Sequence, residues 1–119
     1  MTEKKDGVIK IYHYNTETKL HFTYFIFNKK IEGEYKQYYE NGQLDTICNY
    51  KNYKLSGEYK TYYRNGQLER IWNYKNNKKE GQYKDYYNNG QLRTICNYKN
   101  NIQGEYIRYY FDGKTILNK

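Results

Sequence analysis

Aromatic and polar residues alternate through most of this chain, and the alternation itself recurs. The segment beginning at Gly33, GEYKQYYENGQL, returns as GEYKTYYRNGQL from Gly57 and as GQYKDYYNNGQL from Gly81. A fourth copy begins at Gly104, one residue earlier than the 24-residue spacing would place it. Such self-similarity is typical of tandem repeats, in which each unit is stable only against its neighbours.

Asn-Gly pairs at 41–42, 65–66 and 89–90 divide each unit into two alternating segments. Asn-Gly favours a two-residue type I′ turn, because both turn residues need positive φ. We therefore predict one β-hairpin per unit. In the first unit the predicted opposite pairs are Tyr39 with Leu44, Gln37 with Thr46 and Tyr35 with Cys48 on one face, and Tyr38 with Asp45 and Lys36 with Ile47 on the other.

The second segment of each unit ends in Asn-Tyr-Lys-Asn, and a short polar turn leads from there to the next glycine. The hairpins should therefore continue into one another as an all-β antiparallel β-meander. Residues 1–32 are interpreted as a degenerate N-terminal capping repeat. Residues 33–119 form the rest of one repeat domain, with units at 33–56, 57–80, 81–103 and 104–119.

One face of this sheet is aromatic and is assigned to the core. Structural roles are predicted for the turn glycines and for the main members of this face, which are Gly42, Gly66, Gly90, Gly113, Tyr35, Tyr59, Tyr83, Tyr106, Leu44, Leu68, Leu92 and Trp72. The same face carries the Cys48 and Cys96 thiols. Cross-strand pairs contribute only about 0.2 to 1 kcal/mol each, so several repeats are needed for stability.

The opposite face is basic and carries a stripe of tyrosines. Its candidate partner-binding residues are Tyr38, Tyr62, Tyr86, Tyr109, Lys36, Lys60, Lys84, Ile47, Ile71 and Ile95, and a second lysine column lies at 51, 75 and 99. The formal net charge of +8 fits phosphate-bearing partners. The tyrosines can stack on bases, enter a lipid interface or anchor a protein, and their spacing leaves all three open.

Catalytic and metal chemistry find little support in the sequence. Cys48 and Cys96 lie about four strand spacings apart, roughly 19 Å, so they cannot form a disulfide within this fold and are predicted to be buried thiols. His13 and His21 lack Cys or carboxylate neighbours at metal-ligand spacing, and the single serine, Ser56, has no triad partner. We expect no enzymatic activity and no cofactor.

The repeat unit resembles the MORN repeat family through the motif Gly-x-Tyr-x-x-Tyr-Tyr-x-Asn-Gly-x-Leu followed by Asn-Tyr-Lys-Asn. Within that family it is most similar to the variant found in bacterial YwqK-type proteins and in arrays from large DNA viruses. The resemblance covers residues 33–113 well and 7–32 weakly. It implies a curved, elongated, single-layer β-meander that binds proteins or membranes. The incomplete fourth copy suggests an open edge, and the shortened turn before Gly104 suggests altered curvature.

The leading interpretation is a noncatalytic interaction module, either a protein-binding scaffold or an antitoxin-like binder. The alternative is a peripheral adaptor for anionic membranes, and nucleic-acid binding comes third. Self-association through the aromatic face or the C-terminal edge is also expected. No apolar run is long enough to span a bilayer and residues 1–10 lack a signal-peptide core, so the expected location is the cytoplasm, or the host cytoplasm for a viral protein.

Overall fold

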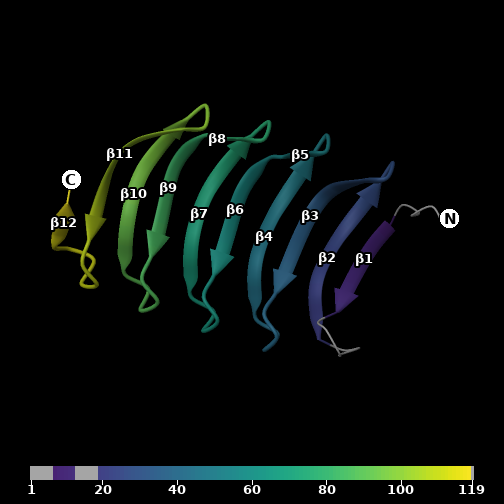
Figure 1. Ribbon diagram of the computed structural model, residues 1–119, viewed down its shortest axis with the longest axis horizontal. Coiled ribbons are helices and arrows are strands. Elements are labelled where there is room, and N and C mark those ends of the chain that lie inside the picture. Colours follow the sequence, from purple (N-terminus) through teal and green to yellow (C-terminus); the bar gives the residue numbers. More distant parts are fainter. Residues whose placement is uncertain (1–6, 13–18, 119) are drawn as a thin grey trace.

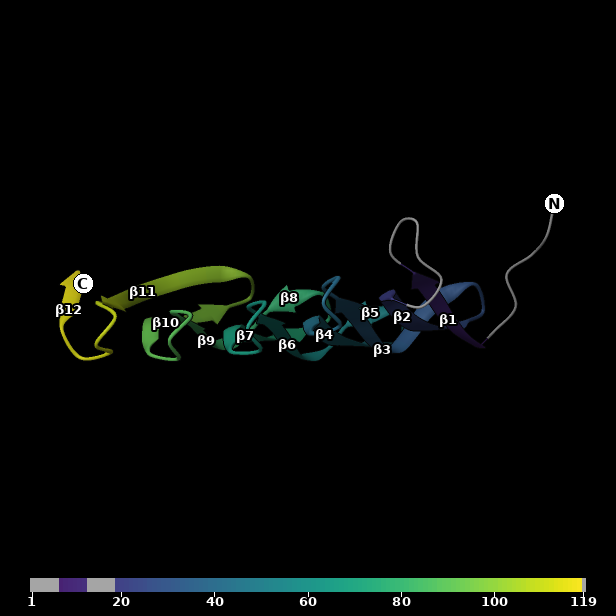
Figure 2. The ribbon, with the colours of Figure 1, turned by 90° about the horizontal axis from the view of Figure 1, so that it is seen from below.

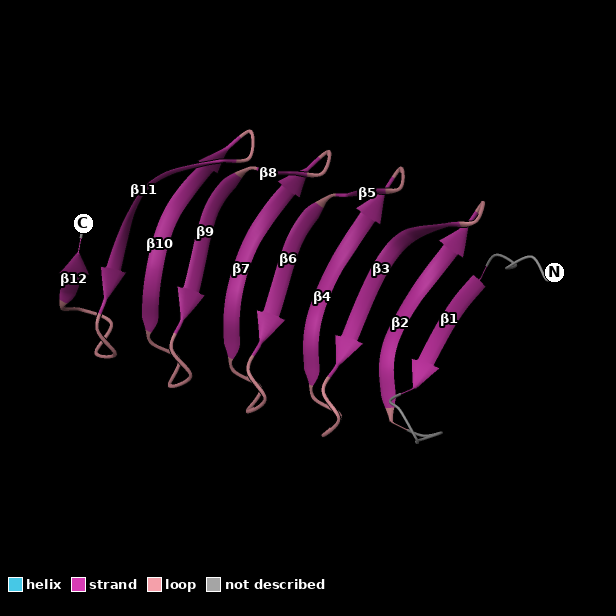
Figure 3. Cartoon of the chain, viewed as in Figure 1, coloured by secondary structure: helices cyan, strands magenta, loops and turns pink. Residues whose placement is uncertain are grey.

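The computed structural model describes residues 7–12 and 19–118, and within these it forms one open antiparallel sheet of 12 strands (Figures 1 and 3). The strands are β1 (Gly7–Tyr12), β2 (Leu20–Phe27), β3 (Lys30–Tyr38), β4 (Leu44–Lys51), β5 (Lys54–Leu55), β6 (Gly57–Tyr62), β7 (Leu68–Lys75), β8 (Lys78–Lys79), β9 (Gly81–Tyr86), β10 (Leu92–Lys99), β11 (Ile102–Tyr109) and β12 (Ile116–Asn118).

Apart from β5 and β8, each strand pairs with the next one along the chain, while β5 and β8 are short strands that pair only with β4 and β7. The first and last strands, β1 and β12, lie at opposite ends of the sheet (Figure 1). The molecule measures 56 × 33 × 16 Å, and its strands lie in a single layer when the sheet is seen edge-on (Figure 2). The predicted fold class, an elongated meander of β-hairpins, is confirmed.

The predicted type I′ turn at Asn-Gly is wrong. Gly42 has a φ of 88°, but Asn41 is absent from the residues with positive φ. The Gly42 N–H donates to the Tyr39 carbonyl at 3.0 Å, and the Tyr39 N–H donates to the Gln43 carbonyl at 2.8 Å. This is a three-residue loop in which a type I turn is followed by a left-handed glycine. The loops at Gly66 and Gly90 repeat it.

The longer loop changes the register next to it. Tyr38 lies opposite Leu44, so the predicted pairs Tyr39 with Leu44 and Tyr38 with Asp45 are wrong. Asp45 is the extra residue of a bulge, and Leu44 shares the face of Tyr38, because directly opposite residues lie on one face. Away from the loop, the predicted pairs are confirmed, namely Gln37 with Thr46, Lys36 with Ile47 and Tyr35 with Cys48.

Type I′ geometry occurs instead at the other edge of the sheet. Two consecutive residues with positive φ lie in each of four two-residue turns, at Asn28–Lys29, Asn52–Tyr53, Asn76–Asn77 and Asn100–Asn101. Asparagine tolerates the left-handed region better than other residues with a side chain, which explains its place at the first position. Sequence reasoning treated these segments only as short polar turns.

Two of these turns, Asn52–Tyr53 and Asn76–Asn77, are followed by one extra residue that forms a bulge before the next long strand begins. These residues are Ser56 and Glu80. The Ser56 N–H donates to the Asn49 carbonyl at 3.0 Å, and the Glu80 N–H donates to the Asn73 carbonyl at 2.9 Å. The final unit lacks this residue, so β11 runs unbroken through Gly104. A Cβ at Gly104 would lie 3.1 Å from the Asn97 carbonyl oxygen, so glycine favours the close approach of the two strands there.

The aromatic face contains the most deeply buried side chains of the repeats. Cys48, Trp72 and Cys96 are 3%, 8% and 4% exposed. Trp72 stacks on Tyr59 with ring centroids 4.6 Å apart and reaches Tyr83 in the next hairpin at 5.8 Å. The core is therefore a line of side chains that runs along the sheet from one repeat to the next.

Hydrogen bonds from side chains to backbone tie adjacent repeats together at both edges. At the Asn-Gly edge, each loop tyrosine donates to a carbonyl of the next unit: Tyr39 to Tyr62 at 2.5 Å, Tyr63 to Tyr86 at 2.5 Å and Tyr87 to Tyr109 at 2.6 Å. At the opposite edge, the Leu55 N–H donates to Asn77 Oδ1 at 2.7 Å, and the Asn77 N–H returns a bond to the Leu55 carbonyl.

These contacts predict a difference between two adjacent tyrosines. Tyr63→Phe removes the hydroxyl that bonds to the Tyr86 carbonyl and should lower the free energy of unfolding by about 1 kcal/mol. Tyr62→Phe is the matched control, because no hydrogen bond from the Tyr62 hydroxyl occurs within the described residues. Urea titration followed by Trp72 fluorescence measures both. Equal effects of the two substitutions would contradict the role of the loop tyrosines.

Burial also predicts loss of stability at alkaline pH. Desolvation raises the pKa of Tyr35 to about 12, and it raises the pKa of Tyr59, Tyr63 and Tyr83 above the ordinary value of 10.0. Because the unfolded chain ionises first, this stabilisation is complete below pH 10 and is lost as pH rises toward 12. The urea midpoint should fall over that interval while tyrosinate absorbance increases. A constant midpoint from pH 9 to 12 would rule out the buried tyrosines as its cause.

Candidate functional site

The strand register brings the lysines and isoleucines of the predicted binding face into one row across the sheet. Neighbouring members lie on adjacent strands, about 4.8 Å apart. From β3 to β11 the row is Lys36, Ile47, Lys60, Ile71, Lys84, Ile95 and Ile107. The six predicted Lys and Ile residues are half-buried, so their ends remain accessible from this side.

The tyrosine stripe forms a second row nearer the Asn-Gly loops. Tyr38, Tyr62 and Tyr86 lie opposite Leu44, Leu68 and Leu92, and Tyr109 lies opposite Ile116. All four tyrosines are half-buried. The hydroxyls of Tyr62, Tyr86 and Tyr109 make no hydrogen bond within the described part of the chain. We call the two rows together the Tyr/Lys/Ile face.

This face is less basic than its lysines alone suggest. Lys36 Nζ lies 3.2 Å from Glu34 Oε1, and Lys60 Nζ lies 3.3 Å from Glu58 Oε1. Each glutamate is two residues earlier on the same strand, and therefore on the same face. Lys84 has Gln82 at the equivalent place. Such exposed pairs add little stability, but they offset the positive potential of the face.

The excess positive charge gathers at the edge formed by the type I′ turns. Lys51 lies directly opposite Lys54, and Lys75 lies directly opposite Lys78. Like charges in this arrangement destabilise a sheet, so the fold itself gives no reason for them. The lysine edge consists of the exposed residues Lys51, Lys54, Lys75, Lys78 and Lys99. Sequence reasoning missed Lys54 and Lys78; the only signal was their position beside the turn asparagines.

The two cysteines are unsuited to redox or nucleophilic chemistry. Both are unpaired and buried, which confirms the prediction of buried thiols. Burial raises the pKa of Cys48 to about 11, and burial followed by the charge of Asp85 raises the pKa of Cys96. The protonated thiol therefore dominates at neutral pH, and it is a poor nucleophile and metal ligand.

The histidines add no metal site in the part of the chain that can be described. His21 lies in β2, whereas His13 lies outside the described residues. Among residues 7–12 and 19–118, no group of three His, Cys, Asp or Glu side chains is placed to hold a metal. A search of the same residues for a helix long and apolar enough to cross a membrane finds none.

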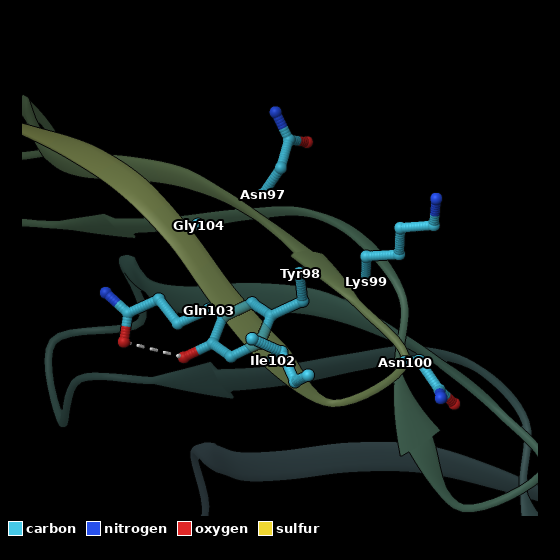
Figure 4. Close-up of a pocket in the computed structure, with 7 residues that line it drawn as sticks. All are labelled: Asn97, Tyr98, Lys99, Asn100, Ile102, Gln103 and Gly104. Atoms are coloured by element: carbon cyan, nitrogen blue, oxygen red, sulfur yellow. Dashed lines mark hydrogen bonds between the residues drawn. The ribbon is translucent and has the colours of Figure 1, made fainter.

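Two cavities lie next to the final turn. The larger, about 510 Å³, is formed by residues 97–100 and 102–104, where the bulge residue is missing. Figure 4 shows the Tyr98 hydroxyl directed toward Gln103, to which it donates at 3.4 Å, while Asn97 and Lys99 point away from that pair. The smaller cavity, about 160 Å³, shares Tyr98 and Gln103 and extends over Asp85 and Arg108.

Comparison with protein families identifies the repeat directly. The model for the MORN repeat variant matches three consecutive segments, at residues 31–52, 55–76 and 79–100. No curated protein and no solved structure gives a significant match. The matched segments cover more than half of the chain and follow the β3–β4, β6–β7 and β9–β10 hairpins. The chain therefore belongs to the MORN repeat variant family.

Proposed function

We propose that this protein is a noncatalytic binding module, a scaffold or an antitoxin-like binder, that holds a protein partner on the Tyr/Lys/Ile face. The observation that carries this proposal is the unbroken row from Lys36 to Ile107 beside a parallel row of tyrosines. MORN repeats are generally interaction or binding modules, in agreement with this role.

The chemistry of the face favours a protein over a phosphate-bearing partner. The half-buried Tyr62, Tyr86 and Tyr109, whose hydroxyls make no hydrogen bond within the described residues, combine a rigid apolar ring with a polar tip, which suits them as anchors in protein interfaces. The Lys36–Glu34 and Lys60–Glu58 pairs alternate donors and acceptors instead of presenting one sign of charge. Such a surface offers a partner both salt bridges and apolar contacts. The proposal places the module in the cytoplasm and relates it to the YwqK-type or viral branch of the family.

A second candidate function uses the lysine edge. The paired lysines at 51 and 54 and at 75 and 78 form a strip of exposed positive charge that suits an anionic membrane surface. Nucleic-acid binding through the same strip is the third candidate. Because the lysine edge and the Tyr/Lys/Ile face use different residues, the candidates can be separated by substitution.

Self-association is a further proposal, supported by apolar exposure in and beside the β11 and β12 strands. Ile102 and Phe111 are 72% and 67% exposed, and Ile107, at the end of the Lys/Ile row, is 38% exposed. A second copy of the chain can cover such side chains. This contact would leave the hairpins at β6–β7 open to another partner.

Affinity capture from lysate of the native host tests the leading proposal. The double variant Tyr62→Ser with Tyr86→Ser should lose at least about tenfold of the captured partner, because both anchors lose their rings. The matched control, Lys51→Gln with Lys75→Gln, changes only the lysine edge and should capture the partner normally. Circular dichroism establishes that each variant folds. Undiminished capture by the folded tyrosine variant would exclude the Tyr/Lys/Ile face as the binding site.

Sedimentation with acidic liposomes at low salt tests the lysine edge. If the edge binds anionic membranes, the Lys51→Gln and Lys75→Gln variant should sediment less than wild type, and added salt should release both. If all five edge lysines contact duplex DNA instead, the slope of log affinity against log salt should be about −4 to −5. Absence of sedimentation by wild type would eliminate the membrane candidate, and a slope near zero would eliminate the DNA candidate.

A further inference from the structure

The third hairpin departs from the charge pattern of the first two. At the bulge beside the Asn-Gly loop, Asp45 and Glu69 are followed by Arg93, while the facing strand changes from Gln37 and Thr61 to Asp85. The bulge position therefore changes from acidic to basic, and the facing position changes from neutral to acidic. Asp85 is 4% exposed, and a carboxylate at such depth requires partners.

The carboxylate of Asp85 is satisfied within its own hairpin. Arg93 Nε donates to Asp85 Oδ1 at 3.0 Å, and the Tyr83 hydroxyl donates to Asp85 Oδ2 at 2.9 Å. The Arg93 guanidinium therefore balances the carboxylate charge. The Asp85 carboxylate borders the smaller cavity. Because Arg93 balances its charge, it repels an anionic ligand only weakly.

Arg108 occupies the next strand along the same row. It lies opposite Thr94, which in turn lies opposite Asp85. Arg108 Nε donates to Thr94 Oγ1 at 3.3 Å, and the guanidinium carbon lies 5.9 Å from the centre of the Tyr106 ring. Within the described residues no carboxylate pairs with Arg108, whereas Arg93 has Asp85 and Arg70 has Glu69 at 3.9 Å. The two terminal amino groups of Arg108 remain available.

A small side chain opens the cavity beside Arg108. Cys96 stands where Trp72 stands one repeat earlier, and Trp72 fills its row by stacking on Tyr59 and reaching Tyr83. The Cys96 thiol leaves a hollow of about 160 Å³ bordered by Tyr83, Tyr98 and Tyr106. Drug-sized ligands and cofactors occupy larger pockets, of about 300 to 1,000 Å³, so this hollow suits a single side chain.

We propose that this cavity receives an acidic side chain, aspartate or glutamate, of a protein partner. A guanidinium binds a carboxylate through two parallel hydrogen bonds, and the bond to Thr94 Oγ1 together with the approach to the Tyr106 ring orients the Arg108 side chain. The Tyr98 hydroxyl and the Gln103 amide border the same hollow and supply further polar contacts. The formal charge of +8 also attracts an acidic partner. The inference goes beyond the proposed function, because Asp85, Thr94 and Arg108 lie on the aromatic face, opposite the Tyr/Lys/Ile face.

Titration of ¹⁵N-labelled protein with capped amino acids tests the site directly. N-acetyl-glutamate amide should cause saturable NMR shifts at Arg108 Nε–H and at the backbone amides of Thr94, Cys96 and Tyr106. N-acetyl-glutamine amide, its neutral counterpart, should not. N-acetylglycine carries its carboxylate at the chain end and mimics a C-terminus. If it binds as well as the glutamate compound, the site recognises a C-terminal carboxylate and the proposal of an acidic side chain is rejected.

Three variants locate the binding. Arg108→Gln should weaken binding of the glutamate compound about tenfold or more, because a charge-assisted pair is lost. Cys96→Trp copies the side chain of Trp72, fills the hollow and should block binding while Arg108 stays present. Arg64→Gln is the control, since Arg64 lies over the Tyr39 ring in an exposed loop. Native-like spectra establish folding.

The proposal is overturned if wild type shows no saturable shift, if the glutamine compound binds equally well, or if Arg108→Gln binds like wild type. Its failure is distinct from failure of the proposed function, because the capture experiment substitutes only Tyr62 and Tyr86. If capture depends on those tyrosines but the NMR titration shows no saturable shift, the binding-module proposal stands and the acidic side-chain site is rejected.

Discussion

A sheet with a single layer must draw its stability from contacts between neighbouring strands, because no second layer covers either face. Side-chain hydrogen bonds join neighbouring repeats in addition to the ladder of backbone bonds. At one edge the loop tyrosines make this connection, since Tyr39, Tyr63 and Tyr87 each bond to a carbonyl of the following unit. Asn77 does so at the other edge. Stability is therefore a sum of nearest-neighbour terms.

The same constraint decides what each face can offer a partner. Trp72 and Cys48 lie in the core of the aromatic face, Cys96 borders the smaller cavity there, and half-buried tyrosines with raised pKa values accompany them. On the opposite face, one residue per strand forms the Lys/Ile row, and nothing in the described structure packs over it. A partner meets the same chemistry at every second strand, about 10 Å apart, so contacts can multiply along the array.

The repeat, the meander and the pairs away from the loops followed from the sequence because alternation fixes which residues share a face. Turn types did not follow. Asn41 accepts a bond from its own loop and donates to the Arg64 carbonyl of the next unit, so a contact between repeats accompanies the three-residue loop. The positions of the Lys/Ile row were readable for the same reason as the pairs. The Lys51–Lys54 pair could not be predicted in this way, because it depends on a type I′ turn at Asn52–Tyr53 that contains no glycine.

Departures from the repeat carry different information from the repeat itself. A residue found at the same place in every unit is accounted for by contacts that every unit makes, as with the loop tyrosines. Asp85, Arg93 and Arg108 have no such counterpart, and Asp85 and Arg108 both line the smaller cavity. The bonds of Asp85 to Arg93 and Tyr83 satisfy a buried charge, but a neutral residue at position 85, like Thr61, would need no such partners. Folding therefore explains how the cluster is tolerated, and recognition of a partner supplies a reason for its presence.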